Sequence, residues 1–246
     1  MNNIKALVLA AGKGTRLRTE GVNLPKVMRL ADGKPLLHYV LSALDFLPQQ
    51  DVILVVGYQK EAVLEAYPQY PHAVQEIQNG TGHAVQCAAH LLEDFDGHVL
   101  ICCGDTPLMQ RETFRSLVDI HLKEGNACTM LSAILDEGGN YGRVLREEDG
   151  SFKCIVEARD CTPEQAAVRE VNVGAYLFRV PELLSALSQL KNDNAQGELY
   201  LTDCPAIIKA AGHRVGVCDT CSAQEMLGVN TVEQLQEVED ILRGAR

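Results

Sequence analysis

Two glycines and several cations lie close together near the start of the chain, directly after a short apolar run. The segment that begins at Leu9 reads LAAGKGTRL, and Pro25 follows shortly afterwards. Because Gly12 and Gly14 have no Cβ, their backbone can approach a ligand closely, and successive N–H groups can point at an anion. Positive charge comes from three side chains, Lys13, Arg16 and Lys26. The pattern predicts a phosphate-binding loop after a strand.

The two common phosphate loops do not fit this segment. A dinucleotide fingerprint needs a third glycine where Leu17 stands, and GKGT lacks the spacing of a P-loop. A simple turn would account for the glycines alone. The nearby Thr15, Arg16, Pro25 and Lys26 favour a loop that binds a ligand.

A carboxylate follows the apolar run at residues 99–103. That run predicts a buried central strand, and Gly-Asp-Thr-Pro comes directly after it, so Asp105 lies at the carboxyl end of the strand. Ligands of open α/β sheets bind outside those ends, where a carboxylate can hold a metal near a phosphate. The alternative is an N-cap for the helix expected near Arg111, but Pro107 and Leu108 intervene.

Strands and helices are expected to alternate along most of the chain. Strands are predicted at residues 4–9, 51–56, 73–77, 99–103, 127–135, 171–178 and 215–218, and helices at 35–47, 59–66, 83–92, 181–190, 198–211 and 232–242. A polar hairpin is predicted from 143–146 and 151–157 around Asp149-Gly150. The roles of two residues have alternatives. Thr81 either caps a helix or contacts a ligand, and Glu157 is either a surface charge or an acceptor for a sugar hydroxyl. The alternation predicts an α/β fold, a Rossmann-like, mostly parallel (mixed) sheet flanked by helices with a small hairpin insertion. No linker or repeat interrupts it, so one domain over residues 1–246 is expected.

Amino-acid composition and net charge indicate which classes of binding partner to expect. The 246 residues are 46% hydrophobic and 22% charged with a net charge of -11, so nucleic acid and anionic membranes are not expected as partners. No run approaches the roughly 20 apolar residues of a membrane span, and the apolar start is too short for a signal peptide, which predicts a cytoplasmic location. Nine cysteines, an odd number, are expected to be reduced; Cys218 and Cys221 form a lone C-x-x-C with no second pair, which disfavours a zinc or redox role.

Eight runs, in order along nearly the whole chain, resemble the pyrophosphorylase part of bacterial N-acetylglucosamine-1-phosphate uridyltransferase, within the sugar nucleotidyltransferase superfamily. They are LAAGKGTRL with LPKV, QNGTGHAVQ, GDTPL, NYGRV, IVEARD, EVNVG, NAQGELYLTD and GVN. The first run indicates the superfamily only. QNGTGHA and NAQGELYLTD are narrower and indicate the uridyltransferase.

The resemblance implies an Mg²⁺-dependent enzyme that makes UDP-N-acetylglucosamine, a peptidoglycan precursor, and pyrophosphate from UTP and N-acetylglucosamine 1-phosphate. It assigns nucleotide binding to Ala11, Gly12, Gly14, Thr15, Gln75, Gln78, Gly80 and Thr81. It assigns catalysis to Arg16, Lys26 and Asp105, with the two cations on the triphosphate. It assigns substrate binding to Gly142, Glu157, Asn172 and Asn230, and magnesium to Asp105 and Asn230.

The sequence departs from the family pattern in two places. The family usually has Thr where this chain has Val173, so a hydroxyl beside Asn172 is lost. The family's usual enzyme also continues into a left-handed β-helix with acetyltransferase activity, whereas this sequence ends at Arg246; a monomer or weak homodimer is therefore expected. Two alternatives stay open: a nucleotidyltransferase for another base, sugar, polyol phosphate or molybdopterin cofactor, and a non-catalytic nucleotide-sugar sensor.

Overall fold

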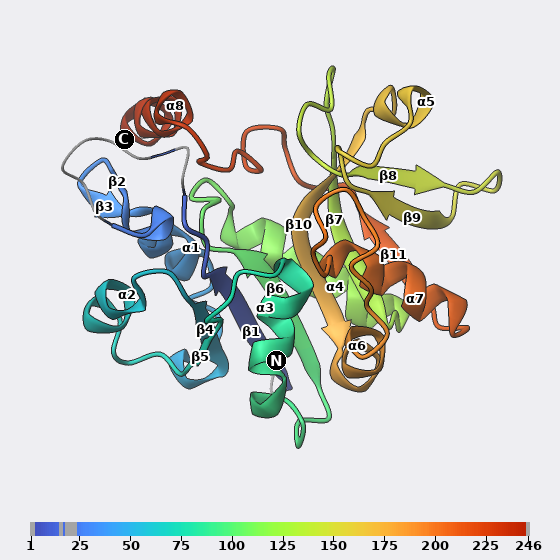
Figure 1. Ribbon diagram of the computed structural model, residues 1–246, viewed down its shortest axis with the longest axis horizontal. Coiled ribbons are helices and arrows are strands. Elements are labelled where there is room, and N and C mark those ends of the chain that lie inside the picture. Colours follow the sequence, from blue (N-terminus) through green and yellow to red (C-terminus); the bar gives the residue numbers. More distant parts are fainter. Residues whose placement is uncertain (1–2, 15–16, 18–23, 245–246) are drawn as a thin grey trace.

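A twisted mixed sheet runs through the centre of the computed structural model, which describes residues 3–14, 17 and 24–244 (Figure 1). Within these residues the sheet has nine strands, and its main path runs β11-β7-β10-β6-β1-β4-β5. The strands of this path are β1 (Ile4–Ala10), β4 (Val52–Val56), β5 (His72–Val74), β6 (His98–Cys103), β7 (Cys128–Ile134), β10 (Glu170–Arg179) and β11 (Val215–Cys218).

Strand β1 occupies the centre of the parallel part of the sheet. It pairs in parallel with β4 on one side and β6 on the other, so that Leu7 lies between Ile53 and Ile101. Strand β5 is parallel to β4, and β11 is parallel to β7. Only β10, among these seven strands, runs antiparallel to its neighbours, β6 and β7. All five residues of β4 are buried, as expected for a strand covered on both faces.

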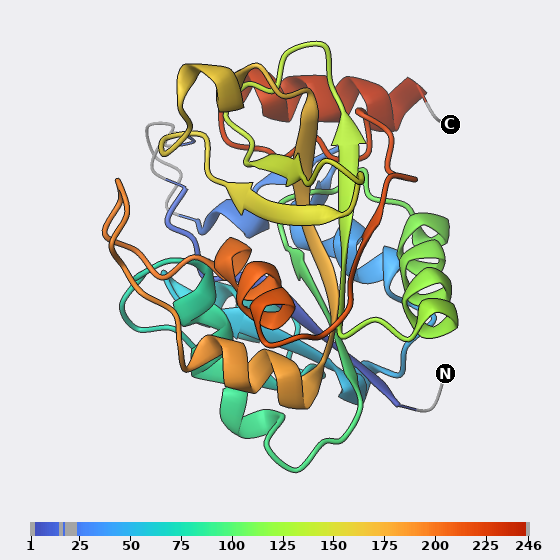
Figure 2. The same cartoon turned by 90° about the vertical axis from the view of Figure 1, so that its right-hand side faces the viewer.

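Helices cover both faces of the sheet (Figure 2). Alternate residues of β1 face opposite ways: Ala6 and Val8 belong to one apolar cluster and Leu7 to the other. The first cluster packs under α1 (Leu36–Ala43), α2 (Lys60–Ala66) and α4 (Arg111–Glu124), and the second under α3 (Thr81–Ala88), α6 (Val180–Leu187) and α7 (Cys204–Ala210). The predicted α/β fold with a mixed, mostly parallel sheet is therefore confirmed.

The predicted hairpin insertion is present beside the main sheet. Strands β8 (Arg143–Arg146) and β9 (Phe152–Val156) pair with each other, and β8 joins β10 where Arg143 lies opposite Val171. The buried Arg143 guanidinium donates hydrogen bonds to the carbonyl oxygens of Gly139 and Ala166. This side chain fastens the hairpin to the preceding loop and to the short helix α5 (Pro163–Ala166).

A third apolar cluster holds the last helix, α8 (Val232–Gly244), near the start of the chain. Val238 of α8 packs in this cluster with Leu17 and Ala31, and Ala31 belongs to the two-stranded sheet of β2 (Leu30–Ala31) and β3 (Lys34–Pro35). The small sheet was not predicted, because each strand has only two residues. None of the helices in the described ranges has the length and apolarity that a membrane span requires.

Several predicted boundaries were wrong. The third helix begins at Thr81 rather than at 83, α1 ends at Ala43 rather than at 47, and β5 ends at Val74 rather than at 77. The predicted helix 198–211 is instead an extended stretch, a 3-10 turn and α7, because Pro205 occupies the first turn of α7, where its missing N–H costs nothing. The 3-10 turns are Lys26–Met28, Gln49–Asp51, Ala89–Leu91 and Leu201–Asp203.

A buried polar cluster fastens α4 to β6 and β7. The ring of His121, on α4, is fully buried, with Nδ1 2.9 Å from Thr129 Oγ1 and Nε2 2.9 Å from His98 Nδ1. Burial, followed by the nearby His98 ring and the Arg179 cation, lowers the pKa of His121 to about 3. The folded protein therefore keeps this imidazole neutral.

This histidine makes the fold less stable in acid. Because the folded pKa of His121 lies below the unfolded value of about 6.5, the unfolded chain binds more protons, and stability falls as pH falls from about 6.5 toward 3. Urea unfolding at about pH 7 and about pH 5 should show this loss in the wild type and a smaller loss in His121→Gln. His72→Gln, at an exposed position, is the control and should behave as wild type. Equal losses in all three proteins would contradict the role of His121.

Candidate functional site

Two adjoining cavities open at the carboxyl ends of β1 and β6. The first, which we name the loop cavity, has a volume of about 240 Å³ and is lined by Ala11, Gly12, Lys26, Gln75, Gln78 and Gly80, among others. The second, the hairpin cavity, has a volume of about 220 Å³ and is lined by Gly142, Glu157, Asn172, Val173, Thr202 and Asn230, among others. Four residues line both cavities: Leu9, Thr81, Cys103 and Asp105. The two cavities therefore form one divided site.

The glycine loop brings the main chain of Lys26 close to the end of β1. Gly14 has a φ of +57°, in the left-handed region, and a Cβ built on it would lie 2.7 Å from Lys26 Cβ. Any other residue at position 14 would be strained and would push Lys26 away. A Cβ on Gly12 would meet no atom within 4 Å, so the space beside this residue is open to a ligand. These observations fit the predicted phosphate loop.

The turn after β5 forms the far wall of the loop cavity. The buried Gln75 donates from Nε2 to the Gly80 carbonyl oxygen at 3.0 Å, and Gln78 donates from Nε2 to the Gln75 carbonyl oxygen at 3.1 Å. Gly80 has a φ of +99°, and a Cβ there would overlap the carbonyl oxygen of Leu199. The two amides and the glycine therefore set the shape of this wall.

The segment from Leu199 to Thr202 links the two cavities. Leu199 N–H donates to the Asn79 carbonyl oxygen at 3.0 Å, and Leu201 N–H donates to Thr81 Oγ1 at 3.1 Å. One residue further on, Thr202 Oγ1 donates to Glu157 Oε1 at 2.9 Å. Thr81 therefore receives a main-chain hydrogen bond instead of capping α3, whose N-cap is Gly80. The same four residues contact the wall of one cavity and the carboxylate of the other.

Glu157 is a half-buried carboxylate directly after β9. Burial raises the pKa of Glu157, and the hydrogen bond from Thr202 opposes that shift. The carboxylates of Asp160, Asp203 and Glu198 raise the pKa of Glu157 further. A half-buried acceptor in a cavity wall suits a ligand that brings hydroxyl groups. Glu157 lines the hairpin cavity, a position that favours the acceptor alternative, and its role stays a prediction.

Asn172 lines the hairpin cavity from a bulge in β10. Its Nδ2 donates to the Tyr176 hydroxyl at 2.7 Å, and its Oδ1 accepts from Gly174 N–H at 3.2 Å. These two hydrogen bonds fix the orientation of the Asn172 side-chain amide. Val173 is almost fully buried and adds an apolar side chain to the same cavity wall.

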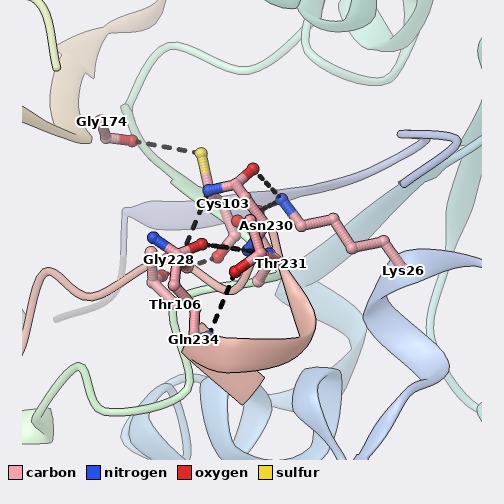
Figure 3. A network of polar contacts seen from close by, with 9 residues as sticks. Lys26, Cys103, Thr106, Gly174, Gly228, Asn230, Thr231 and Gln234 are labelled. Carbon is pink, nitrogen blue, oxygen red and sulfur yellow. Dashed lines mark hydrogen bonds and ion pairs between the residues drawn. The ribbon is translucent and has the colours of Figure 1, made fainter. Parts of the chain in front are cut away.

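Lys26, Asp105 and Asn230 meet where the two cavities join. The Lys26 ammonium forms an ion pair with the Asp105 carboxylate. It also donates to Asn230 Oδ1 at 2.7 Å (Figure 3). The main chain supports this meeting, because Val229 N–H donates to the Asp105 carbonyl oxygen at 3.0 Å. Thr106 Oγ1 donates to the Cys103 carbonyl oxygen at 3.0 Å and closes the turn that carries Asp105. Two side-chain oxygens therefore converge on one cationic nitrogen.

Asn230 is held by the first turn of α8. Gln234 Oε1 accepts hydrogen bonds from the N–H groups of Asn230 at 2.8 Å and Thr231 at 3.1 Å, while Gln234 N–H donates to Thr231 Oγ1 at 3.3 Å (Figure 3). This reciprocal pattern is a capping box. Gln234 was not predicted as a site residue, although T-x-x-Q before an apolar run is its sequence signal.

The Asp105 and Asn230 oxygens suit a magnesium ion. Carboxylate and amide oxygens are hard ligands of the kind Mg²⁺ takes, and an ammonium group already lies between them. No group of three or more His, Cys, Asp or Glu side chains in the described ranges could hold a metal. A metal bound here would therefore need water or ligand oxygens to complete its coordination, as Mg²⁺ commonly does.

The structure brings most of the predicted site residues together. The loop cavity contains Ala11, Gly12, Lys26, Gln75, Gln78, Gly80, Thr81 and Asp105, and the hairpin cavity contains Gly142, Glu157, Asn172 and Asn230. Gly14 lies behind Lys26 rather than in the lining. Thr15 and Arg16 lie outside the described residues, so their predicted roles stay predictions.

Thr202 and Cys103 were missed as site residues. Thr202 lies in the run NAQGELYLTD, which indicated the family, but no local pattern places its hydroxyl against Glu157. Cys103 ends an apolar strand and gave no signal, yet it lines both cavities. Burial raises the pKa of the Cys103 thiol to about 12, so this thiol stays protonated. All nine cysteines are free thiols, as expected.

The divided site at the carboxyl ends of parallel strands is characteristic of α/β proteins that bind nucleotides. Residues 6–203 match the family of MobA-like NTP transferase domains. The chain therefore belongs to that nucleotidyltransferase family.

Known proteins similar to this chain support this assignment. The chain is 42% identical over 261 aligned residues to bifunctional protein GlmU of Corynebacterium aurimucosum, covering 99% of this chain and 53% of that protein. It is 40% identical over 244 residues to bifunctional protein GlmU of Thermoanaerobacter pseudethanolicus, covering 99% and 52%. The chain thus spans about half the length of these curated relatives. A crystal structure described as a glucose-1-phosphate thymidylyltransferase from Bacillus anthracis has the same fold, with a TM-score of 0.76 over 98% of this chain and 95% of that chain at 18% identity.

Gln234→Ala should destabilise the fold, because it removes the side-chain oxygen that accepts from Thr231 N–H in the capping box of α8 and from Asn230 N–H. The expected loss is about 1 kcal/mol in urea unfolding, as for other helix caps. Gln234→Glu keeps the acceptor and should stay close to wild type. The control is Gln236→Ala, which removes an exposed hydrogen bond to Asp240 and should cost less than about 0.5 kcal/mol. Equal stability of Gln234→Ala and Gln236→Ala would argue against the capping role.

Proposed function

We propose that this chain joins UTP to N-acetylglucosamine 1-phosphate and releases UDP-N-acetylglucosamine and pyrophosphate. The observation that carries the proposal is the meeting of the loop cavity and the hairpin cavity at Lys26 and Asp105. The glycines and side-chain amides of the loop cavity suit a nucleotide, and the hydrogen-bond acceptors of the hairpin cavity suit a sugar. Relatives named bifunctional protein GlmU and the resemblance to the uridyltransferase support the choice of substrates.

The loop cavity would hold UTP. The open space beside Gly12 suits the phosphates, and Arg16 and Lys26 would bind the triphosphate. The uracil ring would lie against the turn after β5, where side-chain amides and main-chain groups can pair with its edge. The residues proposed for this pairing are Gln75, Gln78, Gly80 and Thr81, with Ala11, Gly14 and Thr15 completing the nucleotide site.

The hairpin cavity would hold the sugar phosphate. Glu157 would accept hydrogen bonds from sugar hydroxyls, and Asn172 would contact the sugar from β10. Gly142 leaves the space beside this carboxylate open, because a Cβ there would lie in contact with Glu157 Oε2 at 3.6 Å and would crowd Ile155 Cγ2 at 3.1 Å. Val173 supplies an apolar surface in place of the family's hydroxyl, which suits a less polar part of the sugar such as an acetyl group.

The reaction needs little proton transfer. A phosphate oxygen of the sugar phosphate would attack the α-phosphorus of UTP in line, forming one P–O bond while the bond to pyrophosphate breaks. Because that oxygen is already an anion, no general base is required. Lys26 and Arg16 would stabilise the charge that develops on the leaving pyrophosphate, and the two cavity walls would hold the reacting groups in line.

Asp105 and Asn230 would hold Mg²⁺ in this scheme. When bound, the ion offsets the repulsion between the two anionic substrates. The Asp105 side chain lies at the boundary of the two cavities, so it is close to both substrates. The donor set fits this role, since both oxygens already face a cation.

The proposal extends to the form of the protein. We propose one nucleotidyltransferase domain over residues 1–246 that works in the cytoplasm as a monomer or weak homodimer. Its net charge of -11 supports small-molecule substrates rather than nucleic acid or membrane as partners.

A substrate panel tests the proposed reaction. Pyrophosphate release would be measured with Mg²⁺, using UTP, CTP, GTP, ATP and dTTP against N-acetylglucosamine 1-phosphate, glucose 1-phosphate and N-acetylgalactosamine 1-phosphate. Selective turnover of UTP with N-acetylglucosamine 1-phosphate is expected. Turnover of UTP with a different sugar phosphate alone would keep the proposed reaction and show that N-acetylglucosamine 1-phosphate is not the acceptor. Silence from folded protein that still binds UTP would favour a sensor.

Thr202→Val tests the hydroxyl that supports Glu157. The change keeps the side-chain shape but removes the donor to Glu157 Oε1, so the pKa of this half-buried carboxyl should rise further. A carboxyl with a raised folded pKa loses its charge at a higher pH. The acid limb of kcat/KM for the sugar phosphate should therefore shift to higher pH, and KM for that substrate should rise about fivefold, the value of one hydrogen bond.

Two further variants make this result specific. Thr202→Ser keeps the hydroxyl and should restore the wild-type pH profile. Thr220→Val, at an exposed position after β11, should leave the profile unchanged. An unchanged acid limb and KM in Thr202→Val would show that Thr202 does not act on Glu157.

A further inference from the structure

A cationic side chain of the protein itself lies at the proposed metal position. The Lys26 ammonium contacts the carboxylate of Asp105 and Asn230 Oδ1, which are the two side-chain oxygens proposed for Mg²⁺ (Figure 3). Its side chain is 12% exposed, and that of Asp105 is 20% exposed. The ion pair is therefore largely shielded from water. Charges in such a shielded place interact more strongly than charges on the surface.

The start of the Lys26 side chain is fixed, while its end can reach more than one partner. Val27 and Met28 are buried, Arg29 N–H donates to the Lys26 carbonyl oxygen at 3.1 Å, and Gly14 lies directly against Lys26 Cβ. Beyond Cβ, the lysine has a flexible stem with a compact charge at its end. Lys26 also lines the loop cavity, so the same ammonium can turn toward a phosphate there.

The ammonium and a divalent ion cannot share these oxygens at low cost. Both would lie within contact distance of Asp105 and Asn230, and like charges so close repel strongly at low exposure. A triphosphate in the loop cavity would attract the ammonium toward its own oxygens. It would also supply the additional oxygens that a magnesium ion needs.

We propose that Lys26 is the resident cation of the Asp105–Asn230 pair in the free protein, and that a divalent metal enters only when a nucleotide triphosphate draws Lys26 away. The proposal rests on the metal role of Asp105 and Asn230 proposed above. Metal and nucleotide binding are then coupled, and by linkage each strengthens the other. Lys26 thus has two positions, one at the metal ligands and one at the phosphates.

Metal affinity of the nucleotide-free protein tests the proposal. Free Mn²⁺ would be measured by electron paramagnetic resonance in titrations of the wild type and Lys26→Met, with no nucleotide present. Loss of the competing charge should tighten Mn²⁺ binding by at least about tenfold. Lys26→Gln, a second neutral variant, should change affinity in the same direction. Lys123→Met removes an exposed lysine of α4 and should match the wild type.

A double variant tests the competition by Lys26 separately from the metal role of Asp105. If Asp105 is the ligand, the tighter binding of Lys26→Met should disappear when Asp105→Asn is added. Folded Lys26→Met and Lys26→Gln proteins that bind Mn²⁺ no more tightly than wild type would overturn the competition by Lys26. A gain that persists in the double variant would show that the metal binds elsewhere, and would overturn the metal role of Asp105 itself.

The wild-type protein provides a direct measure of the movement. The ¹³Cε signal of Lys26, assigned by its loss in Lys26→Gln, should shift when UTP is added without metal. Mg²⁺ alone should leave it unchanged. A shift with Mg²⁺ alone, or none with UTP, would contradict the two positions of Lys26.

Discussion

The parallel pairing of β1 with both β4 and β6 is the constraint on which the rest of the structure depends. Parallel neighbours point the same way, so the segments that leave their carboxyl ends must all begin at one edge of the sheet. The glycine loop leaves β1 there, and the turn with Asp105 leaves β6 there. Residues far apart in the sequence become neighbours because the parallel pairing brings the carboxyl ends of their strands together at this edge.

Antiparallel β10 divides this edge into two sites. It lies between β6 and β7 and carries the hairpin of β8 and β9 on its far part, so Glu157 and Asn172 face the same space. The segment from Leu199 to Thr202 then crosses from the turn after β5 to Glu157. One sheet edge therefore carries two adjoining cavities, with Lys26 and Asp105 where they join.

The sequence predicted the features that depend on local pattern and missed those that depend on contacts across the fold. Apolar runs identified the strands, and the glycine loop and Asp105 were recognisable from their neighbours. The prediction of one continuous helix over 198–211 was wrong, because an apolar pattern does not show whether Pro205 interrupts a helix or lies in its first turn. The ion pair of Lys26 with Asp105 was not predictable, because it joins a 3-10 turn to a strand end through the folded sheet. Arg16 stays a prediction from the family resemblance.

The capping box of α8 has a consequence for where this catalytic unit can be divided. The family match covers residues 6–203, but Asn230 lies beyond it and depends on Thr231 and Gln234 in the first turn of the last helix. That helix packs through Val238 against Leu17 and Ala31, which flank the segment leading to Lys26. Residues near both ends of the sequence thus form one side of the site. A minimal expression boundary should therefore follow α8 rather than the end of the family match, since a fragment ending at residue 203 would lose strand β11 and Asn230.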